Sequence, residues 1–354
     1  MREVDFYKIP HFFSIKKAIK KMDEGGIGFC VCVDENEKVI GVISDGDFRR
    51  AILNEISLNE NVLKITNKNF KYLTKGYLKE NVLNLFRKTI VEHIPVLENG
   101  KLIEIITKEN FFNIKDKEKN RDLFNIPVVI MAGGKGTRLD PFTRILPKAL
   151  IPIGDKPMIE IIMDEYAKYG VTNFYISVNH RAKMIKAYFE DQDIGYEVKY
   201  IDESRPLGTA GALKFLENKI DSTFFISNCD IIIKDDYCKI YEFHKDRHFD
   251  LTLVASMQHH TVPFGVCEIE NKGHLKEIRE KPEYDFLVNT GMYVLEPLVL
   301  KLIPVDEYFD MTDLISKSQK EGLSIGVYPV SEKSYFDVGQ LAGYKKILNS
   351  LLDS

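Results

Sequence analysis

The 354-residue chain lacks any apolar stretch of the roughly 20 residues that a bilayer span requires. Its first ten residues mix charged and apolar side chains, so they do not form the apolar segment of a signal peptide. We therefore expect a cytoplasmic protein without a membrane partner. Dense basic runs are also missing, and 49 Lys and Arg against 53 Asp and Glu leave a formal net charge of -4. This excludes nucleic acid as an expected partner, because binding a polyanion requires clustered positive charge.

Cysteine is scarce as well, with five residues and no Cys-x-x-Cys pair. Cys30 and Cys32 are two apart in an apolar run, so they would share one face of a strand. We expect buried reduced thiols there and no metal or redox site. What the chain does contain, 44% apolar and 29% charged residues, is typical of a globular protein, and its length predicts two or three domains.

The polar, charged segment 113–125 separates two stretches of different composition. We place a linker at 116–125, between a domain at 1–115 and a domain at 126–354. In the first domain two units share one plan of helix, strand, turn, strand and helix, with strands expected at 28–33 and 39–43 and at 94–97 and 102–106. Because each unit is too short to bury its own core, the two should pack together.

Each unit ends in a hydroxyl residue that is followed three positions later by a carboxylate or an amide: Ser44 and Asp47, then Thr107 and Asn110. With these pairs, residues 14–112 resemble a pair of CBS motifs, an α+β module that often binds adenosine nucleotides and commonly associates into homo-oligomers. The resemblance implies that the hydroxyls contact phosphate and that the carboxylate contacts ribose. Glu104 replaces a glycine of the pattern, so it would repel a phosphate. Alternatively, Ser44 and Thr107 only cap helices and the pair only dimerises.

The apolar run 128–131 predicts a buried parallel strand, and it leads directly into Ala132, Gly133, Gly134, Lys135, Gly136, Thr137 and Arg138. Glycines let backbone N–H groups approach phosphate oxygens, while Lys135, Arg138 and Lys148 supply positive charge. Neither the dinucleotide pattern GxGxxG nor the P-loop GK[ST] is present. The loop therefore predicts a triphosphate site.

Strands and helices alternate from residue 158 to residue 227, including a helix expected at 210–217, which predicts a doubly wound α/β sheet. Ligands bind beyond the carboxyl ends of the strands in such sheets. Gly133, Asn179, Glu203, Gly208 and Asp230 each follow a predicted strand, so we expect them to converge on one cleft.

The run from Gly133 to Arg144, the following 147–152 (PKALIP), and later 206–211 (PLGTAG) and 280–282 (EKP) resemble the signature of sugar-1-phosphate nucleotidyltransferases of the mannose-1-phosphate guanylyltransferase type. The resemblance covers about residues 126–350. It implies a Rossmann-like, GT-A-like fold with a mixed sheet. It also implies attack of a sugar 1-phosphate oxygen on the α-phosphorus of a nucleoside triphosphate, with release of pyrophosphate, supported by Mg²⁺.

Roles for individual residues follow from the same resemblance. Arg138 would hold the β and γ phosphates, Lys148 would bridge phosphate oxygens, and Lys281 would hold the sugar phosphate. Asp230 and Asp337 would bind Mg²⁺; a local turn cap is the alternative for Asp230. The implied nucleotide contacts are Ala132, Gly133, Gly134, Gly136, Thr137, Asn179, Glu203, Gly208 and Thr209. The implied sugar-phosphate contacts are Gly265, Glu280, Lys281, Asn289 and Thr290.

Glu203 favours GTP, because a carboxylate accepts both adjacent donors of guanine, whereas uracil and thymine suit an amide. The alternative is an exposed turn glutamate. Glu280 would suit a substrate amine. We expect His259 and His260 to lie in a solvated loop and assign them no role.

The domain architecture resembles the guanylyltransferases of bacterial nonulosonic-acid pathways, which implies glucosamine-1-phosphate as the substrate in legionaminic-acid synthesis for flagellin or surface glycans. Mannose- or heptose-1-phosphate guanylyltransferases are the nearest alternatives, followed by uridylyl- or thymidylyltransferases. A different class, an adenylate-sensing CBS subunit without turnover, is disfavoured by the intact set of charged site residues.

Overall fold

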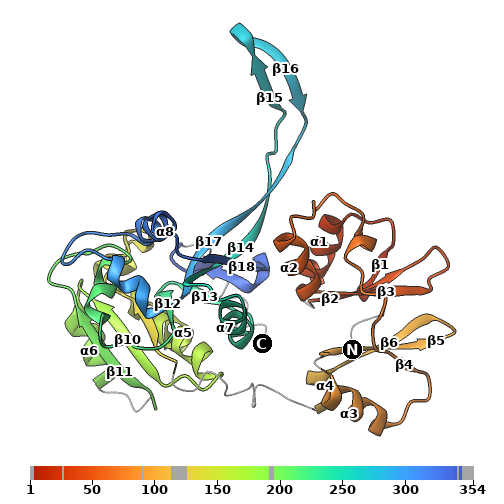
Figure 1. Ribbon diagram of the computed structural model, residues 1–354, viewed down its shortest axis with the longest axis horizontal. Coiled ribbons are helices and arrows are strands. Elements are labelled where there is room, and N and C mark those ends of the chain that lie inside the picture. The colour runs from red at the N-terminus through yellow and green to blue at the C-terminus, as the bar shows by residue number, and fades with distance from the viewer. Residues whose placement is uncertain are drawn as a thin grey trace. The chain divides into compact units, whose positions relative to one another are not determined.

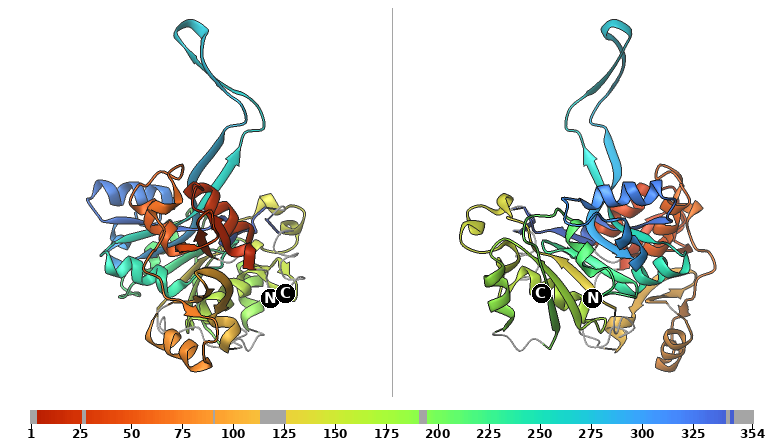
Figure 2. Two further views of the ribbon diagram at one scale, coloured as in Figure 1. Left: turned by 90° about the vertical axis from the view of Figure 1, so that its right-hand side faces the viewer. Right: turned by 60° about the vertical axis from the view of Figure 1, so that its left-hand side comes forward.

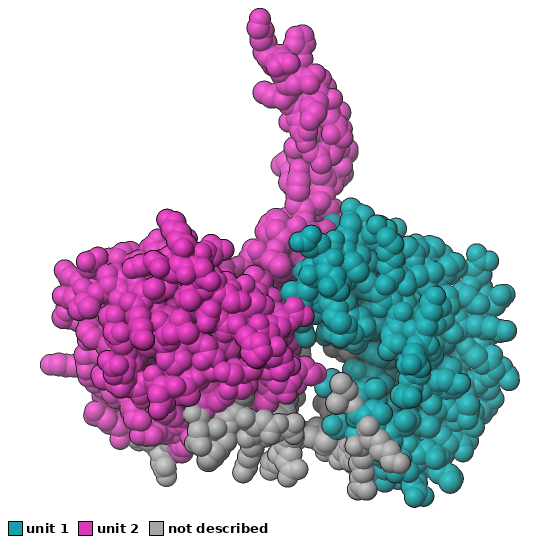
Figure 3. All heavy atoms as spheres, in the orientation of Figure 1, with its two compact units in different colours: residues 1–118 teal, residues 119–354 magenta. Residues whose placement is uncertain are grey.

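The computed structural model describes residues 4–25, 28–89, 91–112, 126–190, 195–340 and 343–344. The chain divides into two compact units, 1–118 and 119–354 (Figure 3). The linker expected at 116–125 lies outside the described residues. Within the described ranges, no helix is long and apolar enough to cross a membrane.

The N-terminal unit consists of two copies of one small motif (Figure 1). In each copy a three-stranded sheet contains a parallel pair and an antiparallel hairpin, and helices flank the strands. The first copy comprises β1 (Lys8–Pro10), α1 (Ile15–Gly25), β2 (Phe29–Val33), β3 (Val39–Ser44) and α2 (Asp45–Leu53). The second comprises β4 (Leu73–Thr74), α3 (Lys79–Lys88), β5 (His93–Glu98), β6 (Lys101–Thr107) and α4 (Lys108–Phe112).

The two copies share a hydrophobic core, as the sequence predicts. Val31 and Val42 of the first copy pack with Leu97 and Leu102 of the second in one buried cluster. The thiols of Cys30 and Cys32 are buried together in a different cluster, and burial raises the pKa of Cys30 to about 12. Both thiols are therefore protonated at neutral pH.

The C-terminal unit is built on a mixed seven-stranded sheet with the order β11-β10-β7-β12-β17-β14-β18. Its strands are β7 (Val128–Met131), β10 (Asn173–Val178), β11 (Glu197–Asp202), β12 (Phe224–Asn228), β14 (Leu251–Thr261), β17 (Glu283–Leu295) and β18 (Ile325–Val330). The first four are parallel to one another, whereas β17 runs antiparallel to both β12 and β14. The apolar run at 128–131 thus forms a central strand, as expected.

Both faces of this sheet are covered. Val128 and Ile130 point into a core with α5 (Met158–Ala167), α6 (Ala182–Glu190) and α7 (Tyr237–Asp246), whereas Val129 points into a second core with α8 (Met311–Lys320). The helix predicted at 210–217 is instead a 3₁₀ helix, η6 (Gly211–Leu216). Its hydrogen bonds span three residues, as from Leu213 N–H to the Ala210 carbonyl at 3.0 Å, which is the tighter winding that short segments adopt.

Among the described residues of the C-terminal unit, three strand pairs lie outside the main sheet. β13 (Ile231–Ile233) pairs with β19 (Tyr335–Asp337) and brings the C-terminal part of the chain beside β12. β15 (Val266–Glu270) and β16 (His274–Arg279) form a hairpin that projects away from the sheet, and we refer to residues 262–282 as the arm (Figures 1 and 2). A short hairpin of β8 (Pro152–Ile153) and β9 (Lys156–Pro157) precedes α5.

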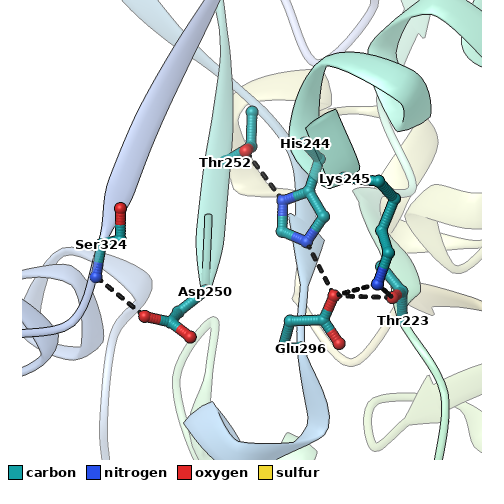
Figure 4. A network of polar contacts seen from close by, with 7 residues as sticks. All are labelled: Thr223, His244, Lys245, Asp250, Thr252, Glu296 and Ser324. Carbon is teal, nitrogen blue, oxygen red and sulfur yellow. Dashed lines mark hydrogen bonds and ion pairs between the residues drawn. The ribbon is translucent and has the colours of Figure 1, made fainter. Parts of the chain in front are cut away.

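A network of polar contacts lies at the end of the sheet where β12 begins and β17 ends (Figure 4). Glu296 accepts hydrogen bonds from Lys245 Nζ and Thr223 Oγ1, both at 2.8 Å, and its Oε1 lies 3.3 Å from His244 Nε2. The fully buried His244 ring places Nδ1 2.8 Å from Thr252 Oγ1. These contacts join polar side chains at the ends of β12, β14 and β17 to two side chains of α7. The network lies at the end of the strands opposite the predicted site.

Candidate active site

The parallel strands end side by side at one edge of the sheet. The register pairs Met131 of β7 with Ser177 of β10 and with Asn228 of β12, and it pairs Val178 of β10 with Asp202 of β11. The residues that follow these strand ends are therefore neighbours in space, as the doubly wound topology requires.

The glycine-rich loop leaves β7 and passes directly over the carboxylate of Glu203. Ala132 is buried and its N–H donates to the Ser177 carbonyl at 2.9 Å. A Cβ atom on Gly133 would lie 2.5 Å from Glu203 Oε1 and 3.4 Å from Asn179 Cβ. Only glycine allows the loop to approach these two side chains so closely.

Farther along, the loop turns against Lys148. Gly136 has a φ of +66°, and a Cβ there would lie 2.8 Å from Lys148 Cβ. Gly134, Thr137 and Arg138 are exposed or open to solvent at this turn. The loop thus leaves Arg138 exposed at this turn, as a site for phosphate would require.

A nearly buried ion pair joins Lys148 to Asp230. Lys148 Nζ donates to Asp230 Oδ2, and the two side chains are 12% and 9% exposed. Asp230 follows β12, and its carbonyl accepts a hydrogen bond from Val338 N–H at 2.8 Å. Lys148 is the first residue of the 3₁₀ helix η5 (Lys148–Leu150), and the ion pair joins it to a carboxylate 82 positions later in the chain.

Asp337 reaches the same place from the far end of the domain. A Cβ on Gly339 would lie 2.1 Å from Asp230 Oδ2 and 3.0 Å from Asp337 Oδ1, so both carboxylates face one point. Burial raises the pKa of Tyr335; Asp337 and Asp230 raise it further, and Arg138 lowers it. Arg138 therefore lies on the same side of the unit as the two carboxylates.

The two carboxylates suit a hard divalent cation. Mg²⁺ takes one or two carboxylates and completes its shell with water and phosphate oxygens. The described part of the chain contains no cluster of three or more metal-ligating side chains, so a cation here would need exogenous oxygen ligands. The donor set of Asp230 and Asp337 fits Mg²⁺ better than it fits a transition metal.

Glu203 is buried, so the alternative of an exposed turn glutamate is wrong. Its Oε1 accepts a hydrogen bond from Ser177 Oγ, and its Oε2 accepts one from Leu207 N–H at 3.1 Å. The Asn179 amide donates to the Glu203 carbonyl at 2.8 Å. These bonds fix the orientation of the carboxylate and leave further acceptor capacity on each oxygen.

Gly208 and Thr209 pack against the segment that precedes α8. Gly208 has a φ of +81°, and a Cβ on it would lie 2.6 Å from the Phe309 carbonyl oxygen. Thr209 donates from both N–H (2.9 Å) and Oγ1 (3.1 Å) to Asp310 Oδ1, and its Oγ1 accepts from Met311 N–H. The Thr209 hydroxyl thus ties the loop to α8, so its role as a nucleotide contact stays a prediction.

The residues predicted to hold the sugar phosphate fall into two groups. Gly265, Glu280 and Lys281 lie together and exposed in the arm: a Cβ on Gly265 would lie 3.0 Å from Glu280 Oε2, and Lys281 N–H donates to Phe264 O. Asn289 and Thr290 belong to β17 instead. Asn289 Nδ2 donates a hydrogen bond to Tyr293 Oη, and the buried Thr290 Oγ1 donates one to the Val254 carbonyl. The arm hairpin of β15 and β16 projects away from β13, which directly follows Asp230, so the arm group lies apart from the Asp230 site (Figure 1).

His259 and His260 lie in β14 and not in the expected loop. Their neighbours on β17 explain the difference: His259 Nδ1 lies 2.6 Å from Asp285 Oδ1, and the His260 ring stacks on Phe286. Cross-strand pairs of this kind extend β14 and β17 beyond the body of the sheet.

In the N-terminal unit, the predicted nucleotide contacts bind each other. Ser44 Oγ donates to Asp47 Oδ2 at 2.7 Å and caps α2, and Thr107 Oγ1 accepts from Asn110 N–H at 3.1 Å at the start of α4. This is the helix-capping arrangement that the sequence left open. Glu104 in turn accepts a hydrogen bond from Tyr77 Oη at 3.1 Å.

Sequence reasoning missed three side chains that hold the site in place. Ser177 orients Glu203, Asp310 binds Thr209, and Arg181 donates to the carbonyls of Arg144 and Ile145 in the segment that leads from the glycine loop to Lys148. No spacing pattern in the sequence marks them, because each acts across the fold on a distant backbone or side chain.

A mixed sheet with a glycine-rich loop after its central strand defines the C-terminal unit as a Rossmann-like α/β domain. The profile of the nucleotidyl transferase family matches residues 127–354, and that of the CBS domain matches residues 1–54 and 62–116. The chain therefore belongs to the nucleotidyl transferase family and carries a CBS pair before the transferase domain.

Two curated relatives show the range of the family. The mannose-1-phosphate guanyltransferase of Yarrowia lipolytica is 36% identical over 187 residues, which are 49% of this chain and 50% of that protein. The UTP–glucose-1-phosphate uridylyltransferase of Synechocystis sp. is 29% identical over 249 residues, 63% of each chain. The chain thus spans between half and 63% of the length of these relatives.

A solved structure shows the same fold. HddC from Yersinia pseudotuberculosis, in complex with GMP-PN, superposes with a TM-score of 0.51 at 27% identity, covering 64% of this chain and 99% of that chain. A putative glucose-1-phosphate thymidylyltransferase from Bacillus anthracis also gives a TM-score of 0.51, at 23% identity, and so shows the fold alone.

Proposed function

We propose that this protein transfers a nucleotidyl group from a nucleoside triphosphate to a sugar 1-phosphate and releases pyrophosphate. The observation that carries the proposal is the Lys148–Asp230 pair, with Asp337 facing the same point, beside a glycine-rich loop at the carboxyl edge of the sheet. Family membership supports the reaction class.

The reaction brings two anions together, so its main obstacle is charge repulsion. Arg138 binds the departing β and γ phosphates, and Lys148 is placed to bind phosphate oxygens near the reacting phosphorus. Asp230 and Asp337 would hold Mg²⁺, which would supply further positive charge to neutralise the phosphates. The backbone N–H groups of the glycine loop orient the triphosphate. Because positioning and charge neutralisation are enough to promote this reaction, it needs no covalent intermediate with the chain.

GTP is the donor that we propose. Glu203 is buried and oriented, with acceptor capacity left for the two adjacent donors of guanine. The mannose-1-phosphate guanyltransferase relatives and the GMP-PN bound to HddC support a guanine nucleotide. A uridylyl- or thymidylyltransferase is the alternative that the same family includes.

The acceptor that we propose is glucosamine-1-phosphate, since the exposed Glu280 carboxylate beside Gly265 would suit a substrate amine and Lys281 its phosphate. Both side chains lie on the arm, so this assignment requires the arm to approach the Asp230 site when the acceptor binds. Mannose- and heptose-1-phosphate are the alternatives. The product would serve legionaminic-acid or related surface-glycan synthesis in the cytoplasm, and the CBS pair would bind an adenine nucleotide and associate into a homo-oligomer.

The test is pyrophosphate release with Mg²⁺ across a grid of GTP, UTP, dTTP, CTP and ATP against the three sugar phosphates and N-acetylglucosamine-1-phosphate. Signal confined to the GTP row supports Glu203 as the guanine contact and identifies the sugar by column. Signal in the UTP or dTTP row keeps the reaction class and refutes the base assignment. No signal in any cell, together with binding of AMP or ATP, favours the adenylate-sensing role.

A further inference from the structure

Arg181 lies in the turn between β10 and α6, and its backbone is in the left-handed region with a φ of +56°. A residue other than glycine adopts this conformation at an energetic cost, and such residues gather at sites where surrounding contacts hold them in place. Arg181 has contacts of this kind: Nη2 donates to the Arg144 carbonyl at 2.5 Å, and Nη1 donates to the Ile145 carbonyl. One guanidinium therefore binds two successive carbonyls of a distant segment.

The segment held by this guanidinium is a short turn that closes on itself and then leads to Lys148. Arg144 closes the turn with two hydrogen bonds to the Asp140 carboxylate, at 2.6 and 2.8 Å. The buried Thr143 packs against the glycine loop, since a Cβ on Gly136 would lie 2.9 Å from Thr143 Cγ2. The same Cβ would lie 2.8 Å from Lys148 Cβ, so the turn and Lys148 pack side by side on one glycine.

The turn that carries this arginine also contacts two other parts of the site. Asn179 Nδ2 donates to the Glu203 carbonyl at 2.8 Å, and His180 N–H donates to the Gly133 carbonyl at 3.5 Å. Three consecutive residues thus connect the glutamate that we assign to the base, the start of the glycine loop and the segment before Lys148. The relative positions of these three parts depend on one turn.

The guanidinium is arranged to hold protein and not substrate. Four of its five N–H donors have protein acceptors: two carbonyls, the Met184 sulfur at 3.8 Å and His180 Nε2 at 3.3 Å. A bidentate contact with a phosphate would need two free parallel donors, and this network leaves one.

We propose that Arg181 is a positioning residue for the transfer reaction: it fixes the backbone that leads to Lys148 and so places the Lys148 ammonium at the phosphates. The inference rests on the proposed function. A misplacement of about 1 Å at a reacting group costs roughly 10²-fold in rate, so loss of Arg181 should lower kcat. Nucleotide affinity should change little, because Glu203 and Arg138 keep their own contacts.

The test compares Arg181→Ala and Arg181→Lys in the full-length chain, with Lys183→Ala, an exposed residue of α6, as the matched control. The readouts are kcat for pyrophosphate release and the Kd of GTP with Mg²⁺ by calorimetry. We expect Arg181→Ala to lower kcat at least about tenfold with Kd within about threefold, and Arg181→Lys to recover most of the rate, since an ammonium also donates to carbonyls. An unchanged kcat in Arg181→Ala overturns the proposal, and so does a rise in Kd that accounts for the whole loss.

A double-mutant comparison tests whether Arg181 acts through Lys148. In a Lys148→Met background, Arg181→Ala should lower the remaining kcat less than about twofold, because its target is already gone. Losses that multiply in the double variant would mean that Arg181 acts elsewhere, which overturns the proposal.

Hydrogen–deuterium exchange tests the same contact without turnover. We expect Arg181→Ala to speed exchange at 140–150 and to leave β12 unchanged. Faster exchange throughout the C-terminal unit would mean that Arg181 only stabilises the fold, and unchanged exchange at 140–150 would mean that it does not hold the segment; each overturns the proposal. A wild type that turns over no substrate refutes the proposed function, whereas the exchange result still decides whether Arg181 fixes this backbone.

Discussion

Replacing Asp230 by asparagine tests the proposed reaction centre directly. The substitution removes the partner charge of Lys148 and one of the two carboxylates that face Gly339. Removing one oriented electrostatic group from a site of this kind costs about 10²- to 10³-fold in kcat. We expect a loss of at least this size in pyrophosphate release, with the variant still folded.

The cost in stability follows from burial. The side chains of Lys148 and Asp230 are 12% and 9% exposed, and breaking such a pair typically costs about 3–5 kcal/mol when the remaining charge is unpaired. Asparagine keeps an oxygen acceptor for Lys148 Nζ, so we expect about 2 kcal/mol, or about 4–8 °C in the melting temperature of the C-terminal unit. Thermal unfolding followed by circular dichroism measures this shift.

Two further variants separate catalysis from stability. Asp306→Asn removes an exposed carboxylate whose contact with Arg205 is 3.5 Å long, so activity and stability should stay close to the wild type. Lys148→Met combined with Asp230→Asn removes both charges and should recover stability while activity stays lost. Wild-type turnover in Asp230→Asn would refute the assignment of Asp230 to the metal site.

Four further predictions concern other residues of the C-terminal unit. Glu203→Gln should lower kcat/KM for GTP about tenfold or more and raise the ratio of kcat/KM for UTP to kcat/KM for GTP, because an amide matches the two donors of guanine less well than a carboxylate does. An unchanged ratio would contradict the assignment of Glu203 to the base. Asp310→Ala removes the hydrogen-bond acceptor of Thr209 and the N-cap of α8. We expect KM for the nucleotide to rise and the free energy of unfolding to fall by about 1 kcal/mol. An unchanged KM in saturation kinetics would show that the Thr209–Asp310 contact serves only the fold. Burial lowers the pKa of His244 below its ordinary 6.5, so below that pH the unfolded chain binds a proton at His244 more readily than the folded chain does. The free energy of unfolding should therefore fall as pH drops below about 6.5. Burial raises the pKa of Glu296, but hydrogen bonds from Lys245 and Thr223 outweigh burial and lower it overall, so the stability that Glu296 contributes is lost as pH falls below its ordinary 4.5. A urea-denaturation profile that is flat from pH 7 to pH 5 would contradict the His244 prediction, and one that is flat from pH 5 to pH 2.5 would contradict the Glu296 prediction.

Much of the fold is readable from local sequence. The strand at 128–131, the glycines that follow it and the alternation of strands and helices to residue 227 all lie where the pattern predicts, because each depends on neighbouring residues and a short period. The segment 210–217 differs, since a helical pattern does not distinguish an α-helix from a 3₁₀ turn. His259 and His260 differ because cross-strand partners on β17 decide whether β14 continues.

The sequence by itself determined the family, the glycine loop and the charged residues of the predicted site, because these are fixed by identity and spacing along the chain. Tertiary structure alone decided which of them meet: it brings Asp337 beside Asp230, buries Glu203 under Gly133, and engages Thr209 with Asp310. It also places Gly265, Glu280 and Lys281 on a projecting arm with one apolar face. Contacts between residues a hundred positions apart depend on sheet order and register, which no local pattern encodes.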